Sequence, residues 1–158
     1  MNRYVVRFDE GVSGKLPIPG GAGDFRILID GETSGAEHFS LLVNEIRPGY
    51  VGGYHQHEVE HGWYILQGRG AIWIGDEEYE IGPEMAVFAP ARVPHKMASY
   101  GPEPLRYVVV YAPAGPEREL RAGGEHAYGA TPPGDAASPS AEPTTAADST
   151  GPVAPTAG

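Results

Sequence analysis

The chain contains no cysteine. Disulfides and thiolate metal sites are therefore excluded, and any metal must be held by imidazole nitrogens and oxygen ligands. The sequence also lacks any apolar run near the roughly 18 residues that a membrane helix needs. Its N-terminus has no basic region followed by an apolar core, as a secretory signal would have. We therefore expect a cytoplasmic protein that does not enter a membrane.

Basic residues are scarce. The sequence has 11 Lys and Arg against 21 Asp and Glu, a formal net charge of -10, and no Lys or Arg after Arg121. An acidic chain repels phosphate backbones and anionic lipid headgroups, which argues against nucleic acid and membranes as partners. The expected partner is a small-molecule substrate.

Large apolar residues are nearly absent from residues 123–158, where Pro, Ala, Gly, Ser and Thr dominate. Such a segment cannot bury enough surface to offset the entropy lost on ordering, so we expect a disordered tail. A chain of 158 residues with 41% apolar content supports one core. We therefore expect one folded domain, residues 1–122.

That domain lacks a long stretch of helical periodicity and instead carries short β-rich runs separated by Gly and Pro. The predicted strands are residues 4–8, 25–29, 39–46, 62–67, 70–74, 77–81, 85–89, 95–99 and 105–112. Strands at this spacing predict an all-β sandwich or barrel. Gly75 and Asp76 predict a tight hairpin turn, because a Gly-Asp step supplies the positive φ that such a turn needs.

Several predicted strands are apolar on both faces, namely the runs WYIL, AIWI and YVVVY. One face of each strand is buried in the barrel, and an apolar outer face needs a second sheet or a second subunit to cover it. We therefore expect a homodimer.

Three of the six histidines, His55, His57 and His61, fall within seven residues, and a fourth, His95, follows later in the chain. In an extended strand residues two apart share a face, so His55 and His57 point the same way, about 7 Å apart along the chain. His61 begins the next strand, and His95 comes from a strand distant in sequence. A lone histidine usually satisfies a hydrogen bond, whereas four at compatible positions indicate a metal site.

These residues resemble the first motif of the cupin superfamily, G-x5-H-x-H-x3-E-x6-G. Gly49, His55, His57 and Gly68 match at the right spacing, and His61 stands where the glutamate usually does. The resemblance covers residues 39–113 and implies a single cupin barrel, a double-stranded β-helix or jelly roll.

The second cupin motif, P-x-G-x2-H-x3-N, is matched in part. Pro90 and His95 agree with it, whereas Arg92 occupies the glycine position and Ser99 the asparagine position. Both motifs occur in order and at about the usual separation, so the resemblance extends over most of the predicted domain.

The histidine in place of the glutamate is similar to a cupin subset with the pattern H-x-H-x-x-E-H, in which four imidazoles hold the metal. The resemblance implies one divalent transition metal, and Fe, Mn, Zn, Ni and Cu are all open. In that subset the glutamate before the third histidine, here Glu60, is not a ligand. Glu60 either orients a ligand or lies on a solvated bend.

Four neutral imidazoles leave the metal charge uncompensated, which makes the metal a stronger Lewis acid. The resemblance implies an enzyme acting on a small oxygenated organic molecule, by dioxygenase-type or by isomerase or cyclase chemistry. One alternative is a non-catalytic module that binds metal or a small molecule. Another is a hydrolase, because residues 60–95 also resemble the C-terminal half of ureidoglycine aminohydrolases, although those are bicupins with Glu and Gln among their ligands.

The predicted pocket wall consists of Trp63, Ile65, Phe88 and Met97. Each of them could equally belong to the barrel core without contacting a substrate. Tyr54 and Tyr100 are the phenols near the motifs that could act as acid or base, and Tyr54 is also a candidate for the wall. An aromatic wall favours a hydrophobic or aromatic oxygenated substrate, such as a polyketide-like compound or a diketone.

Overall fold

The computed structural model describes residues 3–123. Its strands are β1 (Val12–Lys15), β2 (Gly23–Ile29), β3 (Ser40–Ile46), β4 (Glu60–Gln67), β5 (Arg69–Ile74), β6 (Glu77–Ile81), β7 (Ala86–Ala89), β8 (His95–Tyr100) and β9 (Leu105–Ala112). Two short 3-10 turns, η1 (Phe8–Glu10) and η2 (Pro19–Gly21), and one helix, α1 (Glu117–Arg121), complete the described elements. The tail expected at residues 123–158 lies, except for its first residue, outside the described part.

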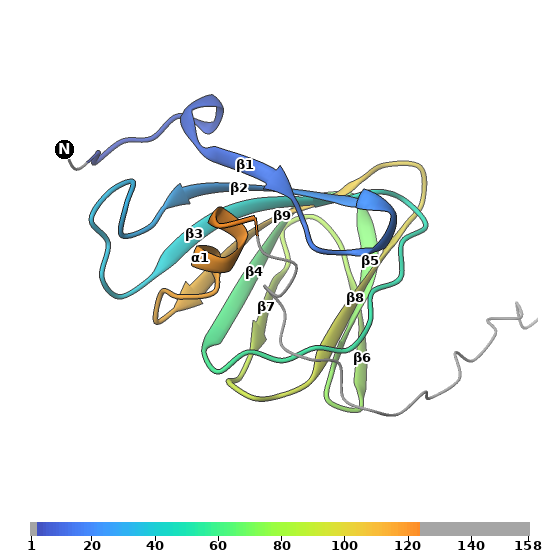
Figure 1. Ribbon diagram of the computed structural model, residues 1–158. Helices are drawn as coiled ribbons and strands as arrows, with labels where there is room; N and C mark the ends of the chain where they lie inside the picture. Colours follow the sequence, from blue (N-terminus) through green and yellow to red (C-terminus); the bar gives the residue numbers. More distant parts are fainter. Residues whose placement is uncertain (1–2, 124–158) are drawn as a thin grey trace, which may run out of the picture.

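Two antiparallel sheets face each other and enclose the core (Figure 1). The larger sheet has the order β1-β2-β3-β9-β4-β7 and the smaller one the order β6-β5-β8. Strands distant in sequence are neighbours in both sheets, as in a jelly roll. The predicted all-β barrel is confirmed, and eight of its predicted strands correspond to β2 through β9.

The strand predicted at residues 4–8 is wrong. Tyr4 is 94% exposed and Val5 83% exposed, and Phe8 begins the turn η1. Residues of high β-propensity form a strand only where a neighbouring strand and a half-buried surface receive them, and this segment has neither. The strand at this edge of the sheet is instead β1, whose Gly and Lys gave no strand signal.

The hairpin predicted at Gly75 is confirmed. Strands β5 and β6 pair antiparallel with Ile74 opposite Glu77, so the loop consists of Gly75 and Asp76. Gly75 has φ 60°, a conformation that glycine adopts without steric cost.

Burial alternates along β9, the strand at the centre of the larger sheet. Leu105, Tyr107, Val109 and Tyr111 are buried and face the smaller sheet, whereas the residues between them are half-buried on the outer face. This period of two fixes which side chains line the barrel interior.

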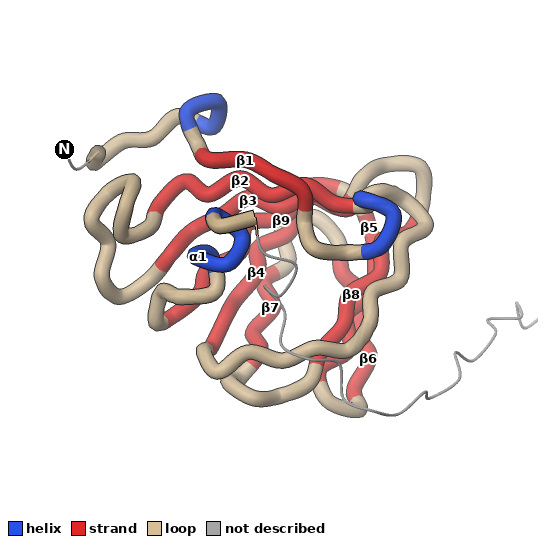
Figure 2. Tube along the Cα trace, in the orientation of Figure 1, coloured by secondary structure: helices blue, strands red, loops and turns tan. Residues whose placement is uncertain are grey.

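The segment between β3 and β4 runs beside β8 and extends the smaller sheet (Figure 2). Isolated bridges pair Val51 with Ala98 and His55 with His95. This loop thereby brings the first histidine motif against the strand that carries the fourth histidine.

Polar contacts of Arg121 and Glu117 attach helix α1 to the barrel. Arg121 donates to the Asp30 carboxylate and to Thr33, and Ser40 donates to Glu117 at 2.8 Å.

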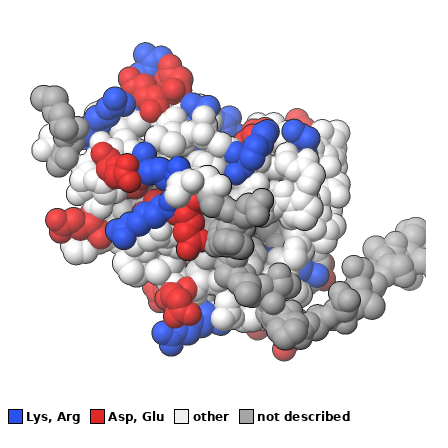
Figure 3. Space-filling model, in the orientation of Figure 1, with Lys and Arg blue, Asp and Glu red and all other residues white. Residues whose placement is uncertain are grey.

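Charged side chains of both signs gather around β1, β2 and α1, while the visible surface over the smaller sheet is mostly uncharged (Figure 3). Among residues 3–123, no helix has the length and apolar character needed to cross a membrane.

Candidate metal centre

The four histidines of the motifs converge at one end of the barrel interior. The ring centroids of His55 and His95 lie 4.4 Å apart, those of His57 and His61 4.8 Å apart, and those of His61 and His95 4.6 Å apart. One ring nitrogen each from His55, His57 and His95 lies within 4.8 Å of the others, a spacing that could hold a metal ion. His61 is outside that three-histidine group but in ring contact with two of its members.

Backbone carbonyls orient two of the rings. The Nδ1 atom of His95 lies 2.8 Å from the carbonyl oxygen of Val93, and that of His55 lies 3.2 Å from the carbonyl oxygen of Gly53. A neutral imidazole that donates through Nδ1 presents the lone pair of Nε2 on its other side. These contacts therefore favour the tautomer in which Nε2 would be the atom that binds a metal.

The remaining nitrogens of this cluster test whether the residues fit a metal. Both ring nitrogens of His61 and the Nε2 atom of His95 are buried without a hydrogen-bond partner. A buried polar atom without a partner costs about 1 to 3 kcal/mol, so native proteins retain few of them. Buried imidazole nitrogens without a partner, next to the group of His55, His57 and His95 and in a site with no thiolate, suit a divalent transition metal.

The electrostatics of the site keep the imidazoles neutral. Burial, followed by the neighbouring imidazoles, lowers the pKa of His55 to about 4, that of His57 to about 3 and that of His61 to about 2. Burial also lowers the pKa of His95, against a hydrogen bond to Val93 that raises it. Neutral imidazole is the form that binds metal, so the site needs no deprotonation at neutral pH.

A cavity of about 450 Å³ adjoins the histidines and runs between the two sheets. Trp63 and Met97, both predicted as pocket wall, line it, as does Tyr54. The Trp63 ring also packs against His61, with ring centroids 4.3 Å apart. None of the described residues that line this cavity is Lys, Arg, Asp or Glu.

The structure places other predicted residues away from this cavity. Phe88 is 58% exposed on the outer side of β7 and borders a separate hollow, so its assignment to the pocket wall is wrong. Ile65 is fully buried in the core without lining the cavity. Tyr100 is exposed at the end of β8, and Glu60 is exposed at the start of β4.

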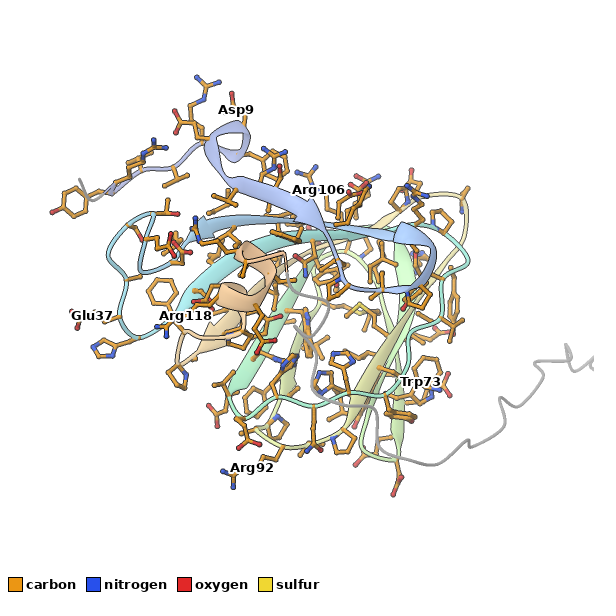
Figure 4. The ribbon with its side chains drawn as sticks, in the orientation of Figure 1. Asp9, Glu37, Trp73, Arg92, Arg106 and Arg118 are labelled. Carbon is orange, nitrogen blue, oxygen red and sulfur yellow. The ribbon has the colours of Figure 1, made fainter. Side chains whose placement is uncertain are left out.

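Arg92, at the glycine position of the second motif, adopts a conformation typical of glycine, with φ 64°. Its backbone N–H donates to the carbonyl oxygen of His57 at 2.7 Å, and its guanidinium forms an ion pair with Glu58 at 2.8 Å. Figure 4 shows the Arg92 side chain extending away from the barrel. These contacts connect the loop that bears His57 to the loop that precedes His95.

Sequence reasoning missed the polar residues of the cavity. Asn44, Tyr50, Tyr107 and Tyr111 all line it. Asn44 lies on β3 between Leu42 and Ile46 at the same alternation, so a polar residue between two apolar ones on one face was the available signal.

The comparisons with known proteins agree with this geometry. A family model described as a cupin domain matches residues 42–111. The polyketide cyclase RemF from Streptomyces resistomycificus is 30% identical, with a TM-score of 0.62, over 72% of this chain and 80% of that one. A comparison with curated proteins finds no match.

Two more distant structures share the fold. KdgF from Halomonas sp. is 18% identical, with a TM-score of 0.62, over 74% of this chain and 99% of that one. A predicted oxalate decarboxylase from Thermotoga maritima is 21% identical, with a TM-score of 0.58, over 70% of this chain and 99% of that one. The matched cupin model, together with the identity to RemF, shows that the chain belongs to the cupin family, and the histidine cluster in a jelly-roll barrel agrees with this.

Proposed function

We propose that this protein is a metal-dependent enzyme that acts on a small, oxygenated, largely apolar molecule by Lewis-acid cyclase or isomerase chemistry. The observation that carries the proposal is the set of buried imidazole nitrogens without partners at one end of a largely apolar cavity. The similarity to a polyketide cyclase supports cyclase chemistry over the other reactions of the fold.

His55, His57, His61 and His95 would hold one divalent transition metal. When bound, such a metal supplies a Lewis acid that polarises a substrate oxygen. The protein contributes rigid orientation of the ligands, through the carbonyls of Gly53 and Val93. Trp63 and Met97 exclude water from the apolar part of the cavity, which strengthens electrostatic interactions there.

Tyr54 is the candidate acid. It lines the cavity, and burial, together with Asp76 and Glu78, raises the pKa of its phenol. The phenol is therefore protonated at neutral pH and can donate a hydrogen bond to a substrate oxygen. Lys96 lies 4.8 Å from the centre of the Tyr54 ring, where it positions this side chain at the rim.

Metal analysis of the full chain tests the ligand set. Purified protein is expected to contain one equivalent of transition metal, and His57→Ala is expected to lose it while remaining folded, because the core is apolar without this ring. His38→Ala, at an exposed position, is the matched control and keeps the metal. A full metal equivalent in His57→Ala would overturn the four-histidine site.

The chemistry is tested with enolisable aromatic diketones as substrates, with product analysis and an oxygen electrode in parallel. Cyclised or isomerised product without oxygen uptake is expected. Oxygen uptake would reassign the protein as a dioxygenase. Metal binding with no turnover of any substrate would favour a non-catalytic binding module.

We also propose that the protein is a homodimer. Tyr64 and Phe88 are 46% and 58% exposed and lie on the outer face of the larger sheet, beside Val108 and Val110. None of these side chains is charged, so two copies of an acidic chain can meet there without direct repulsion. Light scattering is expected to give a dimer for the native chain and a monomer for Tyr64→Glu with Phe88→Glu. A monomeric native chain would refute the dimer.

A further inference from the structure

The inner face of the larger sheet is built of successive cross-strand rows. In the first row His61 pairs with Tyr111, and in the second Trp63 pairs with Val109. In the third row Tyr107 pairs with Asn44 on β3. Two polar rows are thus separated by an apolar one along the length of the barrel.

The rows span the cavity. Tyr111 and Tyr107 both line it and are four residues apart on β9, which corresponds to about 13 Å at the rise of an extended strand. The histidines occupy one end and the third row the other. A ligand that reaches both ends has a polar head, an apolar body and a second polar group.

Asn44 carries an unused hydrogen-bonding atom. Its side chain is 2% exposed and lines the cavity, and its Oδ1 atom has no hydrogen-bond partner. A side-chain hydrogen bond joins Asn44 to the Tyr107 phenol and favours the phenolate form, so the amide nitrogen donates to the phenol oxygen. This acceptor oxygen is covered in the ligand-free protein, and a small shift of the cavity wall would present it to a ligand donor, which is favoured because a buried acceptor without a partner is costly.

The cavity wall around Asn44 is neutral. Burial raises the pKa of Tyr107 and of Tyr50, a further phenol of the cavity wall, so both are uncharged at neutral pH. The described residues around the cavity also include no Lys or Arg to bind a carboxylate or phosphate. A neutral group that donates one hydrogen bond, and also accepts one, matches such a site.

We propose that Asn44 and Tyr107 form a second binding subsite that takes a neutral phenol or enol hydroxyl at the end of the substrate remote from the metal. The ligand hydroxyl donates to Asn44 Oδ1, and its oxygen accepts from the Tyr107 hydroxyl. The subsite makes Asn44 a positioning residue that fixes which end of an extended polycyclic or aromatic ligand faces the histidines. The assignment of the other end rests on the proposed metal function.

The test uses two matched probes with the full-length, metal-loaded protein. The first probe is an anthracene with a catechol on one end ring, and the second carries one additional hydroxyl on the far ring. Dissociation constants are measured by fluorescence titration for the native protein, Asn44→Leu, Tyr107→Phe and Met97→Leu. The result of interest is the ratio of the two dissociation constants within each protein.

In the native protein the far-ring hydroxyl is expected to lower the dissociation constant about tenfold, which is the contribution of one buried hydrogen bond. Asn44→Leu is expected to bring that ratio close to one, and Met97→Leu, an apolar change of similar volume in the same cavity, to leave it intact. A ratio near one in the native protein, or an unchanged ratio in Asn44→Leu, would overturn the subsite.

Two readouts separate this proposal from its alternatives. Removal of the metal is expected to weaken both probes equally, so the absolute affinities report the metal site and the ratio reports Asn44. Ligand-free Asn44→Leu is expected to melt near the native temperature, since it removes the unsatisfied Asn44 Oδ1 atom but also the hydrogen bond to the buried Tyr107 phenol. If that variant does not fold, Tyr107→Phe decides, because it keeps the ring and removes one hydroxyl: a lowered ratio supports the subsite, and an unchanged one overturns it.

Discussion

The replacement of His61 by leucine is expected to change stability in opposite directions in the metal-free and metal-loaded protein. His61 is 3% exposed, and neither ring nitrogen has a hydrogen-bond partner, a defect that costs about 1 to 3 kcal/mol without metal. Leucine has a similar volume and no polar atom, but it gives up the ring contacts with Trp63 and Tyr111. We expect a net gain of about 1 kcal/mol in the metal-free protein.

The gain reverses when metal is present. At a free zinc concentration of about 100 times the dissociation constant, binding adds about 2.7 kcal/mol to the native protein. If loss of one ligand weakens binding about 100-fold, the same zinc adds only about 0.4 kcal/mol to His61→Leu. The variant should therefore be more stable than the native protein in chelator and less stable in zinc.

Thermal unfolding followed by circular dichroism, in chelator and in zinc, measures both effects. A gain of 1 kcal/mol corresponds to roughly 3 to 5 °C for a folded domain of this size. His38→Leu, at an exposed position, serves as the control and should shift neither curve. A His61→Leu variant that is less stable in chelator, or that retains the full response to zinc, would refute the reasoning.

Two further predictions concern stability at low pH and the backbone conformation of Arg92 in the second motif. In chelator, lowering the pH from 6.5 to 5 should lower the urea midpoint, because the unfolded chain then protonates His55 and His57, whose pKa values in the folded state are about 4 and about 3. The loss is at most about 1.4 kcal/mol per pH unit and histidine, and a midpoint independent of pH over this window would contradict the neutral cluster. At Arg92, φ 64° favours glycine over alanine, so Arg92→Ala should be less stable than Arg92→Gly by about 1 kcal/mol in urea unfolding; equal midpoints would show that the loop relaxes.

The sequence predicted features that depend on local pattern. The alternation of β9, the turn at Gly75 and the spacing of His55 and His57 are each determined within a few residues. The predictions that failed concern features that depend on residues far apart in the sequence. Tyr4 lacks a neighbouring strand to cover it, and the N-terminal edge of the larger sheet is formed by β1.

Phe88 shows a second kind of limit. Alternation states which residues of a strand share a face, but the register with a neighbour decides which face points inward. Phe88 pairs with Gly62, whereas Ala89 pairs with His61, so the small residue faces the histidines and the aromatic ring faces outward. Asn44 was missed because an asparagine within a strand is ordinarily on the solvent face, and only its apolar neighbours two residues away indicate burial.

The distribution of charge explains how one metal would orient a ligand in this barrel. The chain carries a formal charge of -10, yet the described residues that line the cavity include no Lys, Arg, Asp or Glu, and the imidazoles are neutral. A metal ion would then be the only net charge inside, where the low dielectric strengthens its field. A neutral ligand reaches the cavity without repulsion from the acidic surface. Its more acidic oxygen would be drawn to the histidine end and its remaining hydroxyl would meet Asn44, so the metal and the proposed subsite together would select one of two orientations.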